Sequence, residues 1–146
     1  MTDCLIRAAT DEDAKEIARI EALSFPAPWT EEMVRSEIRE PLARFFVALD
    51  GDAIIGYYGF LHILDELHIL NVAVDPNCRR RKVGTRLIEH LLEQARVLSA
   101  RALTLEVRES NLPAISLYEK HGFRSVGIRP HYYTDKENAL IYWLEL

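Results

Sequence analysis

An apolar segment, Val72 to Val74, runs into a cluster of basic residues and then into the start of a helix. The basic residues are Arg79, Arg80, Arg81 and Lys82, and Gly84 and Thr85 follow them. Backbone N–H groups at the start of a helix lack partners within the helix and carry a partial positive charge. A phosphate placed there gains hydrogen bonds and a favourable interaction with the helix dipole. This order of strand, basic turn and helix therefore predicts an anion-binding site.

The basic turn is a weak signal by itself, because a run of positive charge is often only a solvated surface. It lacks the Gly-Lys-Ser/Thr of a P-loop, and its single glycine, Gly84, does not make a dinucleotide-binding fingerprint. Its position still favours a bound anion. Cations in the first turn of a helix oppose the helix dipole unless a negative group offsets them.

The rest of the chain alternates between predicted strands and helices. Capping residues and apolar positions at helical spacing predict helices after Thr10, after Thr30, after the basic turn and after Asn111. Asp50-Gly51 predicts the turn of a hairpin. The predicted strands are Cys4 to Arg7, Arg44 to Leu49, Ala53 to Ile63, Glu66 to Val74, Ala102 to Val107, Arg124 to Tyr133 and Ala139 to Leu146. This pattern predicts a single α/β domain, residues 1–146, in which a mixed sheet carries helices on both faces.

Length, charge and cysteine content limit the kinds of site, compartment and partner that this chain can have. A chain of 146 residues can bury a core without a metal or a disulfide. Cys4 and Cys78 lack the spacing of a zinc site and suit a reducing compartment. No cationic and apolar leader begins the chain, so we expect a cytoplasmic protein. The longest apolar run, residues 53–64, is too short to span a bilayer, and a net charge of −5 argues against general binding to nucleic acid. We expect a monomer with neither a membrane nor a nucleic-acid partner.

Two further residues predict transfer chemistry beside the anion site. Glu106 lies on the face of its predicted strand opposite the apolar Leu103 and Leu105. Tyr118 follows twelve positions later, in a predicted short helix that could bring its phenol to the same cleft. A carboxylate and a phenol can act as general base and general acid. Without the anion site, a surface carboxylate and a packed aromatic ring would be the simpler interpretations.

These motifs, in this order, resemble those of the GNAT superfamily of N-acetyltransferases. The resemblance covers nearly the whole chain and rests on the basic turn, on Leu105-Glu106-Val107-Arg108 with Asn111, and on residues 117–123. Within the superfamily, three features resemble the RimI branch: Pro28-Trp29, the Glu-Val-Arg-x-Ser-Asn pattern at residues 106–111, and the segment Arg129 to Tyr133. Enzymes of that branch acetylate the N-terminal alanine of a small-subunit ribosomal protein.

The resemblance implies a fold, a co-substrate, an acceptor and a set of site residues. It implies the GNAT fold with a mostly antiparallel twisted sheet, acetyl-CoA as co-substrate, and a protein N-terminus, such as that of a ribosomal protein, as acceptor. We expect no metal, because the cysteines lack the spacing of a zinc site. Glu106 would accept a proton and Tyr118 would donate one. Cofactor contacts would come from Val72, Ala73, Val74, Arg79, Arg80, Arg81, Lys82, Val83, Gly84, Thr85 and Asn111. Trp29, Tyr132 and Tyr133 are weaker candidates for the acceptor groove.

One position departs from the family pattern, because Lys82 stands where the family has a glycine. Lysine keeps the backbone N–H group that a phosphate would contact. A left-handed conformation would cost a residue with a side chain ~1–2 kcal/mol, so we expect a negative φ at Lys82.

Two other functions stay open at this point. An acetyltransferase for a small-molecule amine or a lysine would share the cofactor residues and differ in the acceptor groove. A non-catalytic module that binds acyl-CoA would need neither Glu106 nor Tyr118, and a single turnover of acetyl transfer would exclude it.

Overall fold

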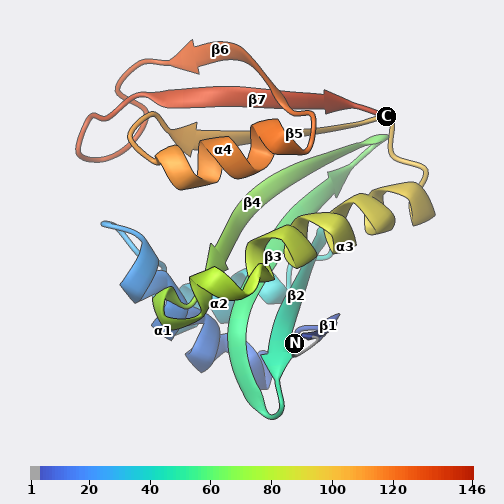
Figure 1. Ribbon diagram of the computed structural model, residues 1–146, viewed down its shortest axis with the longest axis vertical. Coiled ribbons are helices and arrows are strands. Elements are labelled where there is room, and N and C mark those ends of the chain that lie inside the picture. The colour runs from blue at the N-terminus through green and yellow to red at the C-terminus, as the bar shows by residue number, and fades with distance from the viewer. Residues whose placement is uncertain (1–3) are drawn as a thin grey trace.

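The computed structural model describes residues 4–146, and the side chains of Arg80 and Arg81 lie outside that description. Within this range seven strands form one sheet in the order β1-β2-β3-β4-β5-β7-β6 (Figure 1). The strands are β1 (Leu5–Ala8), β2 (Ala43–Asp50), β3 (Ala53–Ile63), β4 (Glu66–Val74), β5 (Ala102–Arg108), β6 (Arg124–Arg129) and β7 (Ala139–Glu145). The helices are α1 (Ala14–Ser24), α2 (Glu31–Ile38), α3 (Val83–Val97) and α4 (Leu112–Lys120), with short 3-10 helices η1 (Asp11–Asp13) and η2 (Pro76–Arg81).

The sheet is antiparallel at each pair of neighbouring strands except β4 and β5, which run parallel. The pairing of β4 with β5 is short and ends where His68 meets Thr104. Beyond this point the two strands separate, and Figure 1 shows β4 diverging from β5. The mixed, mostly antiparallel sheet is therefore confirmed, and it opens between the C-terminal halves of β4 and β5.

A bulge in β4 lies next to this opening. Gly59 of β3 pairs with Asn71, and Phe60 pairs with Ile69, so Leu70 is an extra residue on β4. A bulge bends its strand and increases the local twist. The bulge therefore lies in the segment of β4 that has left β5.

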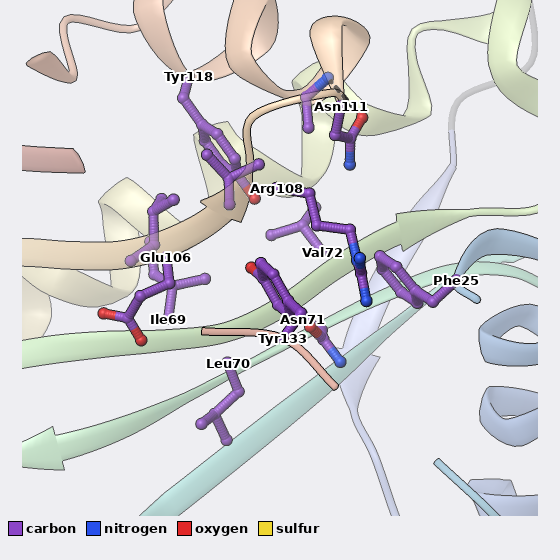
Figure 2. A pocket seen from close by; sticks show the side chains of 13 residues that line it. Phe25, Ile69, Leu70, Asn71, Val72, Glu106, Arg108, Asn111, Tyr118 and Tyr133 are labelled. Carbon is purple, nitrogen blue, oxygen red and sulfur yellow. Dashed lines mark hydrogen bonds between the residues drawn. The ribbon is translucent and has the colours of Figure 1, made fainter. Parts of the chain in front are cut away.

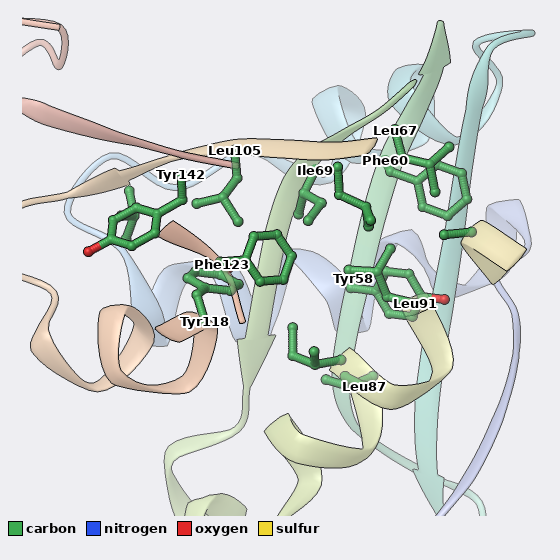
Figure 3. Close-up of a cluster of buried hydrophobic side chains, with 14 of the residues drawn as sticks. Tyr58, Phe60, Leu67, Ile69, Leu87, Leu91, Leu105, Tyr118, Phe123 and Tyr142 are labelled. Atoms are coloured by element: carbon green, nitrogen blue, oxygen red, sulfur yellow. The ribbon is translucent and has the colours of Figure 1, made fainter. Parts of the chain in front are cut away.

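Helices cover both faces of the sheet, as the sequence predicts. One apolar cluster, with Ile17, Ile20 and Val34, packs α1 and α2 on one face. A second cluster packs α3 and α4 on the other face, and Figure 3 shows Leu87 and Tyr118 within it. Among the described helices, none has both the length and the apolar character needed to cross a bilayer.

Several local predictions are confirmed by the backbone. Gly51 has a φ of 60° in the turn between β2 and β3. The hydroxyl of Thr30 accepts a hydrogen bond from the N–H of Met33 at 3.2 Å and so caps α2. Gly122, which follows α4, has a φ of 94°, a conformation that favours glycine at the end of a helix.

Two predicted boundaries are wrong. The helix expected directly after Thr10 begins as η1 and becomes α-helical only at Ala14. The strand expected to reach Tyr133 ends at Arg129. Pro130 follows and has no N–H to donate to a strand ladder, and His131 has a φ of 54°. Tyr133 and its neighbour Tyr132 therefore lie in the loop between β6 and β7.

Candidate active site

Three cavities adjoin one another at the opening between β4 and β5. We call them the basic cavity, the central cavity and the aromatic cavity, with volumes of about 490, 70 and 420 Å³. The central cavity shares Val72 and Asn111 with the basic cavity, and Glu106 and Tyr133 with the aromatic cavity. It therefore lies between the other two, so the opening holds one path with a narrow middle.

The basic cavity brings together most of the residues predicted to hold a cofactor. Its lining includes Val72, Ala73, Val74, Arg79, Lys82, Gly84, Thr85 and Asn111. The side chain of Val83 is not among them, because it is 1% exposed and packs into the core beneath α3. The predicted contacts of the Arg80 and Arg81 side chains lie outside the described residues.

The edge of β4 that faces β5 contributes backbone groups to this region. Within the described chain, β4 residues beyond His68 have no partner strand on that side. Strand residues without a neighbour present free N–H and C=O groups to an extended ligand. Val72, Ala73 and Val74 line the basic cavity along this edge.

Lys82 does not have the negative φ that we expected. Its φ is 58° and its ψ is 28°, and it stands at the junction of η2 and α3. The change from a 3-10 helix to an α-helix takes place at this one left-handed residue. The basic residues before it lie in η2, so they precede the first turn of α3 and do not occupy it. A glycine would adopt this conformation without the ~1–2 kcal/mol that a side chain costs.

Gly84 permits a close approach between α3 and α4. A Cβ atom at this position would lie 3.2 Å from Cδ2 of Leu117 and 3.8 Å from Cγ2 of Val74. A side chain here would therefore crowd the floor of the basic cavity. This requirement was not part of the sequence argument, which assigned Gly84 only to phosphate binding.

The central cavity receives Glu106 from β5 and Tyr118 from α4 (Figure 2). Asn111 lines the same cavity and also begins α4, because its side-chain oxygen accepts a hydrogen bond from the N–H of Ala114 at 3.3 Å. Tyr118 is 5% exposed, and the centre of its ring lies 5.5 Å from the centre of the Phe123 ring. Tyr118 thus packs in the core and also borders the cavity.

Burial controls the ionisation of the two tyrosines that line the central cavity. It raises the pKa of Tyr118 well above the ordinary value, and the neighbouring Tyr133 raises that pKa further. Burial also raises the pKa of Tyr133 to about 12, although the nearby Arg108 opposes this shift. Both phenols therefore keep their protons at physiological pH.

The aromatic cavity lies on the far side of the central cavity from the basic turn. Trp29, Tyr132 and Tyr133, the predicted acceptor-groove residues, all line it. Trp29 comes from the segment between α1 and α2, and the two tyrosines come from the loop between β6 and β7. The structure therefore brings together residues that lie about a hundred positions apart in the chain.

Sequence reasoning gave no role at the site to three residues of this region. Phe25 and Arg108 line all three cavities, and Glu21 lines the aromatic cavity. Glu21 carried a usable signal, because it lies four positions after Ile17 and so falls on the apolar face of α1. Arg108 belongs to the motif Leu105-Glu106-Val107-Arg108, but its role could not be seen in the sequence, because its partners come from the distant loop between β6 and β7.

Residues 14–123 match the Acetyltransferase (GNAT) family. The chain belongs to the GNAT acetyltransferase family. GNAT acetyltransferases use acetyl-CoA, and one solved structure of the same fold, Arabidopsis thaliana NAA60 in complex with acetyl-CoA, has a TM-score of 0.88 and covers 99% of both chains. At 18% identity, that structure shows the fold alone.

Two GNAT relatives are more similar in sequence. A Bacillus subtilis protein, provisionally named a ribosomal protein bS18-alanine N-acetyltransferase, is 38% identical over 147 residues, which covers 99% of this chain and 97% of that protein. The crystal structure of the ribosomal-protein-S18-alanine N-acetyltransferase from Escherichia coli has a TM-score of 0.90 and 32% identity, and the match covers 98% of this chain and 94% of that chain. The expected GNAT fold and the resemblance to the RimI branch are therefore confirmed.

Proposed function

We propose that this GNAT acetyltransferase moves the acetyl group of acetyl-CoA to the N-terminal amine of a protein, with the N-terminal alanine of a small-subunit ribosomal protein as the favoured acceptor. The observation that carries the proposal is the path between β4 and β5. This path has positive charge at one end, aromatic walls at the other, and Glu106 and Tyr118 at its narrow middle. The names of the Bacillus subtilis and Escherichia coli relatives support the choice of acceptor.

The basic cavity has the chemistry that acetyl-CoA requires. Arg79 and Lys82 supply positive charge for phosphate groups, and the absence of a side chain at Gly84 leaves room at the start of α3. The free edge of β4 offers hydrogen-bonding groups to an extended amide chain. When bound, acetyl-CoA supplies an acetyl group activated as a thioester.

Glu106 is suited to remove a proton from the acceptor. An α-amino group has a pKa near 8, so most of it is protonated at neutral pH and cannot attack an acyl carbon in that form. Glu106 lines both the central and the aromatic cavity, which supports a role in accepting a proton from an acceptor bound in the aromatic cavity. It can accept the proton directly or through a water molecule.

Tyr118 is suited to stabilise the sulfur that departs. A phenol with a pKa near 10 is a weaker acid than a thiol with a pKa near 8.5, so full proton transfer is uphill by about 2 kcal/mol at these ordinary values. Burial raises the pKa of Tyr118 and makes that transfer harder still. Tyr118 therefore acts by donating a hydrogen bond to the sulfur, and the proton stays on the phenol oxygen.

A panel of acceptors tests the proposed function. Peptides that differ only in their first residue, together with a polyamine and an aminoglycoside, would be incubated with the enzyme and acetyl-CoA and then analysed by intact mass. We expect the Ala-start peptide to react fastest and Ser-start and Met-start peptides to react measurably, because one methylene group changes selectivity by only ~1–3 kcal/mol. Acetylation of the small amines without the peptides would reject the proposal. The absence of any product in a single turnover would indicate a binding module.

A further inference from the structure

Glu21 is a buried carboxylate that joins three parts of the fold at the aromatic cavity. It lies in α1, is 1% exposed and lines that cavity. One carboxylate oxygen, Oε1, accepts a hydrogen bond from the backbone N–H of Trp29 at 3.0 Å. The other, Oε2, accepts one from Nδ2 of Asn71 at 2.8 Å and one from the hydroxyl of Tyr57.

This arrangement is costly for a residue with only a structural role. Burying a carboxylate costs free energy unless hydrogen bonds or a paired charge offset the loss of water. Among the described residues, Glu21 forms no ion pair, so its neutral donors provide the compensation. Burial also raises the pKa of Glu21 above its ordinary value.

The hydrogen bonds of Glu21 reach two walls of the site, at Trp29 and Asn71, and the neighbouring strand β3, at Tyr57. Trp29 belongs to the segment between α1 and α2 that forms one side of the aromatic cavity. Asn71 flanks the bulge at Leu70 and lines both the aromatic and the central cavity, where Figure 2 labels it. Tyr57 lies on β3, beside β4. The carboxylate therefore sets the separation between the Trp29 segment and the bulged part of β4.

We propose that Glu21 is the positioning residue of the acceptor groove, holding the Trp29 segment against β4 so that the acceptor meets a preformed site. This inference rests on the proposed function, because it takes the aromatic cavity as the acceptor side. Neither Glu21 nor Trp29 nor Asn71 lines the basic cavity. Removing a hydrogen bond of Glu21 should therefore raise KM for the acceptor peptide and leave KM for acetyl-CoA unchanged.

Two adjacent tyrosines of β3 provide a matched test. Tyr57 and Tyr58 are both fully buried, at 0% exposed, and they point to opposite faces of the sheet. The hydroxyl of Tyr57 bonds to Glu21, whereas the hydroxyl of Tyr58 lies 2.6 Å from Nδ1 of His90 on α3. Phenylalanine at either position removes one buried hydroxyl and keeps the ring. Tyr58 lines none of the three cavities of the site, so Tyr58→Phe controls for the loss of stability.

The experiment measures KM for an Ala-start peptide and for acetyl-CoA, together with Tm, in the wild type, Tyr57→Phe, Tyr58→Phe and Glu21→Gln. Both tyrosine variants should lose a few degrees of Tm. Tyr57→Phe and Glu21→Gln should raise KM for the peptide by about 3-fold to 10-fold, the equivalent of one lost hydrogen bond. KM for acetyl-CoA should stay within about 2-fold of the wild type, as should both constants of Tyr58→Phe.

The outcomes separate the two proposals. No acetylation of the peptide by the wild type would reject the proposed function. Acetylation by the wild type with the same peptide KM in Tyr57→Phe and Tyr58→Phe would reject only the role of Glu21, as would an equal rise in KM for both substrates. If Tyr57→Phe does not fold, the comparison of Glu21→Gln with Tyr58→Phe decides the question in the same way.

Discussion

The guanidinium group of Arg108 lies 4.0 Å from the centre of the Tyr133 ring. Nη1 of Arg108 also donates hydrogen bonds to Asp135 and Glu137, each at 2.9 Å. Arg108 is the last residue of β5, two positions after Glu106. The strand that carries Glu106 thus holds the loop that carries Tyr133, and Arg108 helps to position this side of the aromatic cavity.

Replacing Arg108 with lysine should weaken binding of the proposed acceptor. Lysine keeps the charge but loses the planar group that stacks on Tyr133 and binds two carboxylates. We expect kcat/KM for an Ala-start peptide to fall by roughly 5-fold, which corresponds to about 1 kcal/mol. Arg129→Lys is the control, because Arg129 lies farther from its ring, at 5.5 Å from the centre of Tyr132. Equal effects of the two variants would remove Arg108 from this role.

Lys82 allows the cost of its left-handed backbone to be measured. Lys82→Gly and Lys82→Ala both remove the charge from the basic cavity, but only glycine relieves the strain at a φ of 58°. We expect the glycine variant to be more stable than the alanine variant by about 1 kcal/mol in urea unfolding. Both should bind acetyl-CoA more weakly, with a smaller dependence on salt. Equal stability of the two variants would contradict the conformation at Lys82.

The proposed base should show itself in the dependence of rate on pH. Glu106→Gln should lower kcat/KM most at neutral and lower pH, and the loss should shrink as pH rises, because more of the acceptor amine is then already deprotonated. The exposed Glu109 provides a control of the same charge close by in the chain, and Glu109→Gln should keep the wild-type profile. If Glu106→Gln also keeps that profile, Glu106 does not act as the base.

Asp75 should make stability depend on pH at the acidic end. The backbone N–H of Asn77 and the side chain of Arg19 bond to its carboxylate and lower its pKa. A carboxyl group whose pKa is lower in the folded state stabilises that state above the unfolded pKa, about 4, and loses this contribution as pH falls. The difference in unfolding free energy between the wild type and Asp75→Asn should therefore shrink as the pH falls below about 4. A difference that grows with acid would reverse the sign of this linkage.

The predictions that succeeded depend on interactions between near neighbours in the chain. The turn at Gly51 and the cap at Thr30 are determined by residues a few positions apart in the chain. The same is true of the apolar residues that predict β4 and α3. The site residues that were missed depend on distant contacts. Glu21 bonds to Asn71, which lies 50 positions away, and Arg108 binds Glu137 across 29 positions.

The opening between β4 and β5 belongs to the same class of distant relationships. The sequence of neither strand by itself predicts that their pairing stops at His68 and Thr104. The left-handed Lys82 is a different case, because the geometry of the junction between η2 and α3 overrides the preference of the residue itself. Motifs in the sequence were enough to name the proposed catalytic pair, Glu106 and Tyr118, whereas the cavities that surround this pair could be found only from the fold.

N-terminal acetylation is tested most directly by a competition between two acceptors for the same enzyme and acetyl-CoA. One peptide begins with a free alanine, and the other has the same sequence with a blocked N-terminus and an internal lysine. The ε-ammonium group, with a pKa near 10.4, holds its proton more tightly than an α-ammonium group near 8, so Glu106 should deprotonate it poorly. Intact-mass analysis should show acetyl groups accumulating on the Ala-start peptide. Faster modification of the blocked peptide would contradict N-terminal acetylation and would indicate a lysine acetyltransferase on the same fold.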